Sequence, residues 1–187
     1  MKIIKTYIPD LLIIEPKVFE DERGYFFESY NKEDFINNNV NIDFVQDNQS
    51  KSMYGVIRGL HYQLAPHSQT KLVRALRGTI LDVAVDIRKD SPTYGKSFSI
   101  ELSEENKKQL LIPQGFAHGF SVLTDYAVFS YKCDNLYNPN SERGINFLDP
   151  MLNIDWKIDK TKAVVSTKDK VNPSFDDAET NFVYGQI

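Results

Sequence analysis

The chain has 187 residues, of which 41% are hydrophobic and 26% are charged, a composition that suits one packed domain. Its 22 basic and 26 acidic residues give a net charge of −4, which argues against a nucleic-acid-binding protein. The single cysteine, Cys133, excludes an intrachain disulfide, and no apolar run approaches the ~18 residues of a transmembrane helix. Pro9 and Asp10 interrupt the first apolar run, so no secretory signal is expected. We therefore expect a cytoplasmic protein that binds neither nucleic acid nor membrane.

The first third of the chain predicts a hairpin, a short helix and an extended segment. Residues 11–30 hold two β-rich runs around the polar turn "DERG", where Gly24 supplies a positive φ. Residues 31–38 predict a helix with Asn31 as its N-cap. Residues 44–63 are typical of extended chain with a bend near 52–55.

The middle of the chain contains the clearest strand, over residues 79–87. One face of this strand is apolar, and on the other face Asp82 and Asp86 alternate with Ile80 and Ala84. Two acids on one face predict that this face is wet or lines a polar cavity. A second short helix is predicted over 103–109, capped by Ser103, and another strand over 126–133.

The overall pattern is one of many short strands, turn signals between them and few helices. This pattern predicts an all-β protein, a sandwich or barrel of the jelly-roll kind. No linker or repeat divides the chain, so a single domain over 1–187 is expected, with an amino-terminal hairpin arm. The polar tail after about residue 155 is expected to wrap around the barrel.

Several residues could carry chemistry, although each alone is more often structural. They are His61, His118, Arg58, Lys71, Tyr131, Asp82 and Asp169. Histidine titrates near pH ~6.5 and can take and return a proton at neutral pH, and a carboxylate partner would orient its ring. The spacing alone does not say which carboxylate plays this part.

Other classes of site fit the sequence poorly. Metal-binding cupins usually present H-x-H, whereas this chain has His61-Tyr62-Gln63, and His67 lies in a loop beside Pro66. The chain has no phosphate-binding G-x-x-x-x-G-K-[ST] loop, no G-x-G-x-x-G and no G-x-S-x-G. Acid–base chemistry is the class that remains.

Six motifs in order give the chain a close resemblance to a known family. They are "FEDERGYFFESY", "FVQDNQSKSMYGVIRGLHYQ", "KLVRALRGTILDVAVDIRKDSPTYG", "LIPQGFAHGF", "YKCDNLYNP" and "STKD". Over about residues 13–173 the chain resembles the dTDP-4-dehydrorhamnose 3,5-epimerase (RmlC) family. The resemblance implies a cupin-like jelly roll that works as a homodimer without metal or cofactor. The implied substrate is a nucleotide-linked 4-keto-6-deoxyhexose, the implied reaction is epimerisation at C3 and C5, and the implied pathway supplies dTDP-L-rhamnose for surface polysaccharides.

The resemblance also implies roles for individual residues. His61 matches the general base, Asp169 its carboxylate partner, and Tyr131 the acid on the opposite face. Lys71 matches the cation beside the ketone oxygen, where the enolate charge develops. Further implied substrate contacts are Arg23, Glu28, Gln46, Asp47, Asn48, Arg58, His118, Tyr137, Glu142 and Lys168, with Arg23 and Glu28 carried on an arm that reaches the neighbouring subunit's site. Arg88 and Asp90 receive no catalytic role, and Asp82 is expected to support the pocket from behind.

One departure from the family and several alternatives stay open. Family members often carry tryptophan where this chain has Phe147, in a stretch expected near the substrate, which leaves sugar and nucleotide preference open. The alternatives within enzymes are a single-carbon epimerase, an enzyme for a CDP- or GDP-linked sugar, and a metal-dependent cupin. The alternative from another class is a non-catalytic barrel that binds a nucleotide sugar.

Overall fold

A computed structural model describes residues 1–186 of the chain. Its elements in chain order are β1 (Lys2–Lys5), β2 (Leu12–Glu15), β3 (Phe19–Asp21), β4 (Gly24–Phe26), α1 (Lys32–Asn37), β5 (Gln46–Met53), β6 (Val56–Gln63), β7 (Lys71–Arg77), β8 (Thr79–Asp86), β9 (Ser97–Ser103), β10 (Gln109–Ile112), β11 (Phe116–Val122), β12 (Tyr126–Cys133), β13 (Glu142–Gly144), the 3₁₀ turn η1 (Lys160–Lys162), β14 (Val164–Val165) and α2 (Thr167–Lys170).

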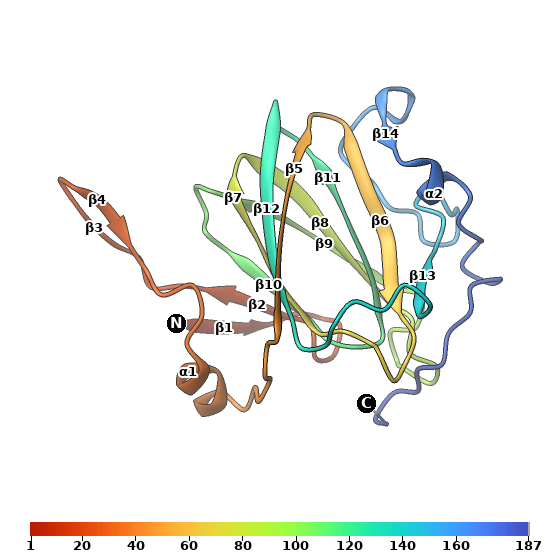
Figure 1. Ribbon diagram of the computed structural model, residues 1–187, viewed down its shortest axis with the longest axis horizontal. Helices are drawn as coiled ribbons and strands as arrows, with labels where there is room; N and C mark the ends of the chain where they lie inside the picture. The colour runs from red at the N-terminus through yellow and green to blue at the C-terminus, as the bar shows by residue number, and fades with distance from the viewer. Residues whose placement is uncertain (187) are drawn as a thin grey trace.

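Two sheets face each other and form the body of the protein (Figure 1). The first sheet has the strand order β1-β2-β10-β7-β12-β5, and the second has the order β13-β6-β11-β8-β9, with β14 added parallel to β6. The other pairings between named strands of these two sheets are antiparallel. This arrangement confirms the predicted all-β jelly roll.

The space between the sheets is filled from alternate positions of each strand. Strand β12 contributes Ala127, Phe129 and Tyr131, and strand β8 contributes Ile80 and Ala84. The odd-numbered positions of β8 pack instead on the outer face of the second sheet, as the alternating pattern predicts. Both faces of β8 are therefore buried.

The carboxyl-terminal segment covers the outer face of the second sheet. Trp156, Phe175 and Phe182 are buried there against the apolar side of β6 and β8. In Figure 1 this segment runs down the outside of β6 from β14 and α2 to the carboxyl terminus. The prediction that the tail wraps the barrel is confirmed, and its aromatic residues explain why a polar tail stays attached.

Helix α1 confirms one helix prediction, and residues 103–109 contradict the other. The side chain of Asn31 caps α1 by accepting from the backbone N–H groups of Glu33 and Asp34. At 103–109 the chain makes only one turn, in which Ser103 and Asn106 exchange hydrogen bonds of 3.0 and 3.1 Å. Lys107 then takes a φ of +54°, which ends the turn before a helix can form.

Of the two settings expected for the acidic face of β8, the wet one is wrong, and the polar cavity is reached only through His118, which lines the cavity and contacts Asp82. Asp82 and Asp86 are both fully buried. Asp82 contacts His118, whereas Asp86 accepts hydrogen bonds from Arg88, Ser91 and Thr93. Each acid is buried because a polar partner lies beside it.

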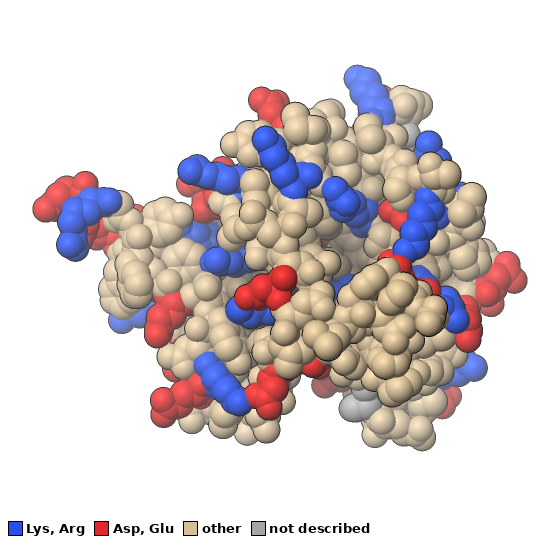
Figure 2. Space-filling model, in the orientation of Figure 1, with Lys and Arg blue, Asp and Glu red and all other residues tan. Residues whose placement is uncertain are grey.

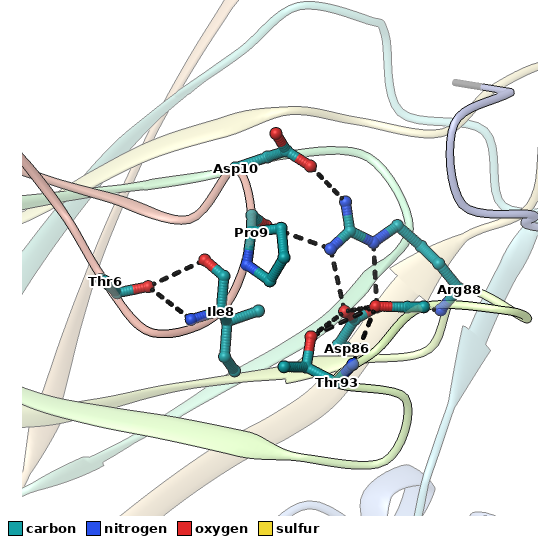
Figure 3. Close-up of polar contacts among 8 residues, drawn as sticks. Thr6, Ile8, Pro9, Asp10, Asp86, Arg88 and Thr93 are labelled. Carbon is teal, nitrogen blue, oxygen red and sulfur yellow. Dashed lines mark hydrogen bonds and ion pairs between the residues drawn. The ribbon is translucent and has the colours of Figure 1, made fainter.

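Arg88 joins three separate segments of the chain (Figure 3). Its guanidinium donates to Asp86 at 2.8 Å, to Asp10 at 2.8 Å and to the carbonyl of Pro9 at 3.1 Å. The same group lies 4.5 Å from the ring centroid of Phe116 and 4.9 Å from that of Tyr184. We call Asp86, Arg88 and Asp10 the clamp, because they tie the β1–β2 turn to β8 and to the tail.

The predicted amino-terminal hairpin is the two-stranded unit β3–β4, which projects from the body in Figure 1. Asp21 pairs with Gly24, whose φ of +117° is open to glycine but strained for other residues. The first apolar run of the predicted hairpin, residues 12–15, belongs instead to β2 of the first sheet.

Candidate active site

A cavity of about 560 Å³ lies between the two sheets, where β5 and β12 of the first sheet face β6 and β11 of the second. Figure 2 shows this side of the molecule hollowed near its centre, with lysine and arginine side chains around the hollow. Its walls include eight of the predicted site residues, namely Asn48, Arg58, His61, Lys71, His118, Tyr131, Lys168 and Asp169.

A β-bulge in β6 explains how Arg58 and His61 reach the same cavity. In a regular strand, residues three apart point to opposite faces. Here His118 pairs with His61 and Phe120 pairs with Arg58, so three steps on β6 match two steps on β11. The extra residue turns both side chains inward. At Gly59 the φ is +128°, and a Cβ atom would lie 2.5 Å from the Cα of Gly119, so only glycine fits this close crossing.

Asp169 reaches His61 from a distant part of the sequence. Strand β14 pairs with the start of β6, and α2 follows directly. Ser166 caps α2 by accepting from the backbone N–H of Asp169 at 3.0 Å. The carboxylate then lies 2.6 Å from Nε2 of His61, and its other oxygen accepts from the backbone N–H of Gly59 at 3.4 Å.

The burial of this pair is uneven. The side chain of Asp169 is 4% exposed and that of His61 is 29% exposed. Burial raises the pKa of Asp169, but the hydrogen bonds from His61, Gly59 and Ser166 outweigh this and hold the pKa below its usual value. The carboxylate therefore stays ionised beside the ring, while one side of the ring faces the cavity.

Tyr131 and Lys71 stand on the opposite wall. Tyr131 lies on β12 and Lys71 on β7, which are neighbours in the first sheet, whereas His61 lies in the second sheet. The ammonium of Lys71 is 6.0 Å from the ring centroid of Tyr131. A ligand between the sheets would meet the histidine on one side and the phenol on the other.

Burial changes the acidity of both groups. It raises the pKa of Tyr131, with Cys133 acting in the same direction and Arg58 against it, so the phenol keeps its proton at neutral pH. It lowers the pKa of Lys71, which Cys133, Asp82 and Glu142 partly offset. A protonated phenol can donate a proton, and a poorly solvated ammonium interacts strongly with a developing negative charge.

The mouth of the cavity carries a polar rim. Lys168 pairs with Glu142 at 2.5 Å, and the hydroxyl of Tyr137 donates to Glu142 at 2.7 Å. Gln46 donates to Asn48 at 3.0 Å and accepts from the backbone of Tyr137. Predicted contacts from β5, the β12–β13 loop, β13 and α2 thus meet at this rim.

Three predicted contacts lie elsewhere. Asp47 points to the outer face of β5, where it pairs with Lys132 at 2.9 Å. Arg23 and Glu28 lie on or beside the hairpin arm; Arg23 pairs with Asp21, and Glu28 accepts from Asn31 at 3.2 Å. Within one chain these three residues do not meet the cavity.

The structure corrects the expected position of Phe147. It was expected near the substrate, but it is buried in the apolar cluster on the outer face of the second sheet. Its ring lies 6.4 Å from that of Trp156, which donates to the carbonyl of Phe147 at 2.8 Å. Phe147 therefore helps to attach the tail and does not line the cavity.

Two contributions to the site were not predicted from the sequence. Ser52 accepts from Nε of Arg58 at 3.0 Å and holds the guanidinium toward the cavity. Val164 and Val165 of β14 form part of the wall. The polar alternation of β5, with Gln46, Asn48, Ser50 and Ser52 on one face, was a usable signal for the first, whereas the two valines gave none.

Residues 1–186 contain no group of three or more His, Cys, Asp or Glu side chains placed to hold a metal ion. Within the same range, no helix is long and apolar enough to cross a membrane.

A jelly-roll barrel with a histidine–carboxylate pair facing a half-buried tyrosine and a half-buried lysine defines the class: an enzyme arranged for proton transfer at a carbonyl compound. Comparison with known proteins gives the family. The family model for dTDP-4-dehydrorhamnose 3,5-epimerase matches residues 5–177. The chain therefore belongs to the dTDP-4-dehydrorhamnose 3,5-epimerase family, a family of isomerases.

Individual relatives agree with this assignment. The dTDP-4-dehydrorhamnose 3,5-epimerase of Shigella flexneri is 54% identical over 180 residues, covering 96% of this chain and 98% of the relative. The crystal structure of the enzyme of that name from Elizabethkingia anophelis is 56% identical, with a TM-score of 0.91 over 95% of this chain and 97% of its own. RmlC of Legionella pneumophila, solved in complex with dTDP-4-keto-L-rhamnose, is 48% identical, with a TM-score of 0.90 over 94% of this chain and 93% of its own.

Proposed function

We propose that this protein converts dTDP-4-dehydro-6-deoxy-D-glucose to dTDP-4-dehydro-L-rhamnose by inverting C3 and C5. Family membership supports the reaction, and so does the dTDP-4-keto-L-rhamnose bound to the Legionella relative. The 4-keto group acidifies the hydrogens on both neighbouring carbons. Inversion then needs a base on one side of the sugar ring and an acid on the other.

His61 is the proposed base. It takes the proton from the carbon next to the ketone, and Asp169 orients its ring and stabilises the imidazolium that forms. The 2.6 Å contact between the two side chains and the ionised state of Asp169 support this role.

Tyr131 is the proposed acid, and Lys71 the proposed partner of the enolate oxygen. The observation that carries the proposal is the placement of His61 and Tyr131 on different sheets, with the cavity between them. A proton removed toward one sheet and replaced from the other inverts the carbon. A non-catalytic binding barrel has no need of such an opposed pair.

The rim is the proposed nucleotide end of the site. The guanidinium fork of Arg58 and the ammonium of Lys168 suit the diphosphate oxygens, and the ring of Tyr137 offers a surface on which the base can stack. His118 lines the cavity close to Lys71 and Tyr131 and would contact the sugar.

The decisive experiment is proton NMR in D2O with dTDP-4-dehydro-6-deoxy-D-glucose and the purified protein. We expect deuterium to enter at C3 and C5 during turnover. Entry at one carbon would contradict double epimerisation in favour of a single-carbon epimerase. Tight binding without exchange would contradict enzymatic activity. The same assay with CDP- and GDP-linked substrates tests the choice of nucleotide.

The proposed assembly is a homodimer in which the arm β3–β4 packs on a second copy. Tyr25 is 60% exposed and Phe26 is 66% exposed, and an isolated two-stranded hairpin is marginally stable in water. In such a dimer Arg23 and Glu28 could reach the partner's cavity. Sedimentation should therefore show a dimer at micromolar concentration, and a fully active monomer would contradict the assembly.

A further inference from the structure

The barrel contains a second histidine–carboxylate pair, formed by His118 and Asp82. The two residues lie on adjacent strands, β11 and β8, where Asp82 is paired with Phe120 and His118 with Ala84. They are therefore diagonal neighbours on the inner face. Nε2 of His118 lies 3.1 and 3.0 Å from the two oxygens of Asp82. Asp82 is fully buried, and His118 is 7% exposed.

Asp82 has one hydrogen-bond partner. Among the described residues, the only group that hydrogen-bonds its carboxylate is the ring of His118. Its neighbours along the inner face of β8, Ile80 and Ala84, are apolar. A carboxylate in such surroundings costs several kcal/mol unless it is paired, so it needs the N–H of the ring.

The carboxylate of Asp82 also acts on a neighbouring cation, Lys71. Lys71 and His118 line the same small void of about 10 Å³, and Asp82 offsets part of the effect of burial on the pKa of Lys71. The negative charge of Asp82 and the positive charge of Lys71 balance each other.

We propose that Asp82 is a positioning residue that fixes His118 in the tautomer with hydrogen on Nε2, so that Nδ1 accepts a hydrogen bond from a hydroxyl of the bound hexose. This proposal rests on the proposed function for the identity of the ligand. In the neutral ring the tautomer follows from chemistry: an ionised carboxylate can only accept, so the N–H points at Asp82 and the lone pair is left on Nδ1. No described residue hydrogen-bonds Nδ1, while the ring lines the cavity.

The role would set both substrate position and selectivity. A 4-keto-6-deoxyhexose linked through C1 keeps hydroxyls at C2 and C3, and both lie within one or two bonds of a reacting carbon. A hydroxyl held by Nδ1 fixes the ring between His61 and Tyr131. A site built to hydrogen-bond a hydroxyl discriminates strongly against an analogue that lacks it.

The first test is 15N NMR of the histidine rings in the unaltered protein, assigned with His61→Asn, His67→Asn and His118→Gln. We expect the His118 signals of a neutral ring protonated on Nε2 at pH 7.5. Hydrogen on Nδ1, or a ring protonated on both nitrogens, would overturn the proposal. Because this measurement needs neither substrate nor turnover, it remains decisive even if the proposed reaction is wrong.

The second test compares Asp82→Asn with the unaltered protein, using the natural substrate and its 2-deoxy and 3-deoxy analogues. An amide can donate to Nε2 and favour the other tautomer. We expect kcat/KM for the natural substrate to fall about 10- to 100-fold, with KM raised, while the analogue that lacks the bound hydroxyl loses no further activity. Equal losses on all three substrates would contradict the hydrogen bond to the sugar.

The matched control for the second test is Asp86→Asn, which removes the other buried acid on the same face of β8. It should lower stability while leaving the His118 signals and the choice among the three substrates unchanged. If the unaltered protein gave no deuterium exchange, the proposed function would fail, and the NMR result would still decide the tautomer.

Discussion

The His61–Asp169 pair and the clamp use similar chemistry for different purposes. In each, a buried aspartate is held ionised by a nitrogen donor, and in each hydrogen bonds lower the aspartate pKa against the effect of burial. In the clamp, Asp86 accepts from Arg88, Ser91 and Thr93, and the guanidinium contacts two aromatic rings. In the pair, one side of the His61 ring faces the cavity, and none of residues 1–186 hydrogen-bonds it there.

The two regions differ in whether a hydrogen-bonding atom is left for a ligand. The side chains of Asp86 and Arg88 have their hydrogen-bonding atoms matched by the protein, so loss of the clamp should lower the free energy of unfolding. The His61 ring faces the cavity and can contact a ligand there, so its loss should lower the rate of the reaction. Substitutions in the two regions test this separation directly, and they are best compared by measuring the rate and the free energy of unfolding of every variant.

The largest expected effect follows from replacing the base. His61→Asn keeps a similar size and some hydrogen-bonding ability, but it cannot take a proton at neutral pH. Loss of a general base costs ~10²–10⁴-fold in rate, so kcat and deuterium exchange should fall by at least this factor while substrate still binds. The free energy of unfolding, measured with urea, should fall by less than the loss expected for the clamp, because the introduced amide can still donate a hydrogen bond to the carboxylate of Asp169.

Two variants set limits on this result. His67→Asn, in the loop between β6 and β7, should keep full activity, because its side chain has no described hydrogen bond and does not line the cavity. Asp169→Asn should also lose activity, and the double variant should be no worse than His61→Asn, since the two residues act as a unit. Near-normal kcat in His61→Asn would make the assignment of the base wrong.

The clamp should show the opposite behaviour. Arg88→Met leaves the buried carboxylate of Asp86 without its cation and frees Pro9, Asp10 and Tyr184 from a common partner. Removing one member of a buried ion pair costs about 3–5 kcal/mol. We expect a loss of this size in urea unfolding, with kcat at 15 °C close to that of the unaltered protein.

A surface pair provides the control for the clamp. Arg77 donates to Glu104 at 2.9 Å, but its side chain is 66% exposed. Arg77→Met should cost no more than about 1 kcal/mol, since exposed ion pairs contribute little. If Arg88→Met and Arg77→Met lowered the free energy of unfolding equally, burial would not make the clamp more stabilising than a surface ion pair.

Local sequence patterns were sufficient to predict much of the fold. The alternation in residues 79–87 and 126–133 predicted β8 and β12 with the correct faces, and Asn31 predicted the start of α1. The predictions failed where tertiary contacts determine the local structure or the burial of a side chain. At 103–109 the capping signal was real, but strands on both sides allowed it only one turn. The acids of β8 are buried because distant partners match them, which no local pattern shows.

The site was predicted less well from physical chemistry than from family resemblance. Spacing alone could not pair His61 with Asp169, because the contact depends on β14 joining β6 and on Ser166 capping α2. Nor could it explain why Arg58 and His61, three residues apart, share one cavity, since the bulge in β6 reverses the normal alternation. The sequence "STKD" did contain a capping pattern that predicts a helical turn, but its charged residues are equally typical of a solvated surface run.

A smaller effect is expected at the rim. Lys168→Gln removes a cation that can contact the diphosphate, and it releases Glu142. We expect KM to rise about tenfold, or about 1.4 kcal/mol, with kcat mostly retained, because a contact far from the reacting carbons binds ground state and transition state alike. Lys170→Gln, on the same helix but outside the cavity lining, is the control and should leave KM unchanged. A fall in kcat at constant KM would contradict a binding role.

The smallest expected effect is a change in how steeply the free energy of unfolding depends on pH. Burial raises the pKa of Asp86, but hydrogen bonds from Arg88, Ser91 and Thr93 outweigh it and hold the folded pKa below the ordinary value of 3.8. The unfolded chain therefore binds a proton here before the folded protein does. The stability that this carboxylate contributes is complete above its unfolded pKa and is lost as the pH falls through the folded value.

Unfolding free energies between pH 6 and pH 2.5 should accordingly fall less steeply for Asp86→Asn than for the unaltered protein. The control Asp125→Asn, in the exposed turn between β11 and β12, should follow the unaltered curve. Parallel curves for Asp86→Asn and the unaltered protein would mean that the clamp carboxylate binds protons equally in both states, and the comparison with the His61–Asp169 pair would lose its electrostatic basis.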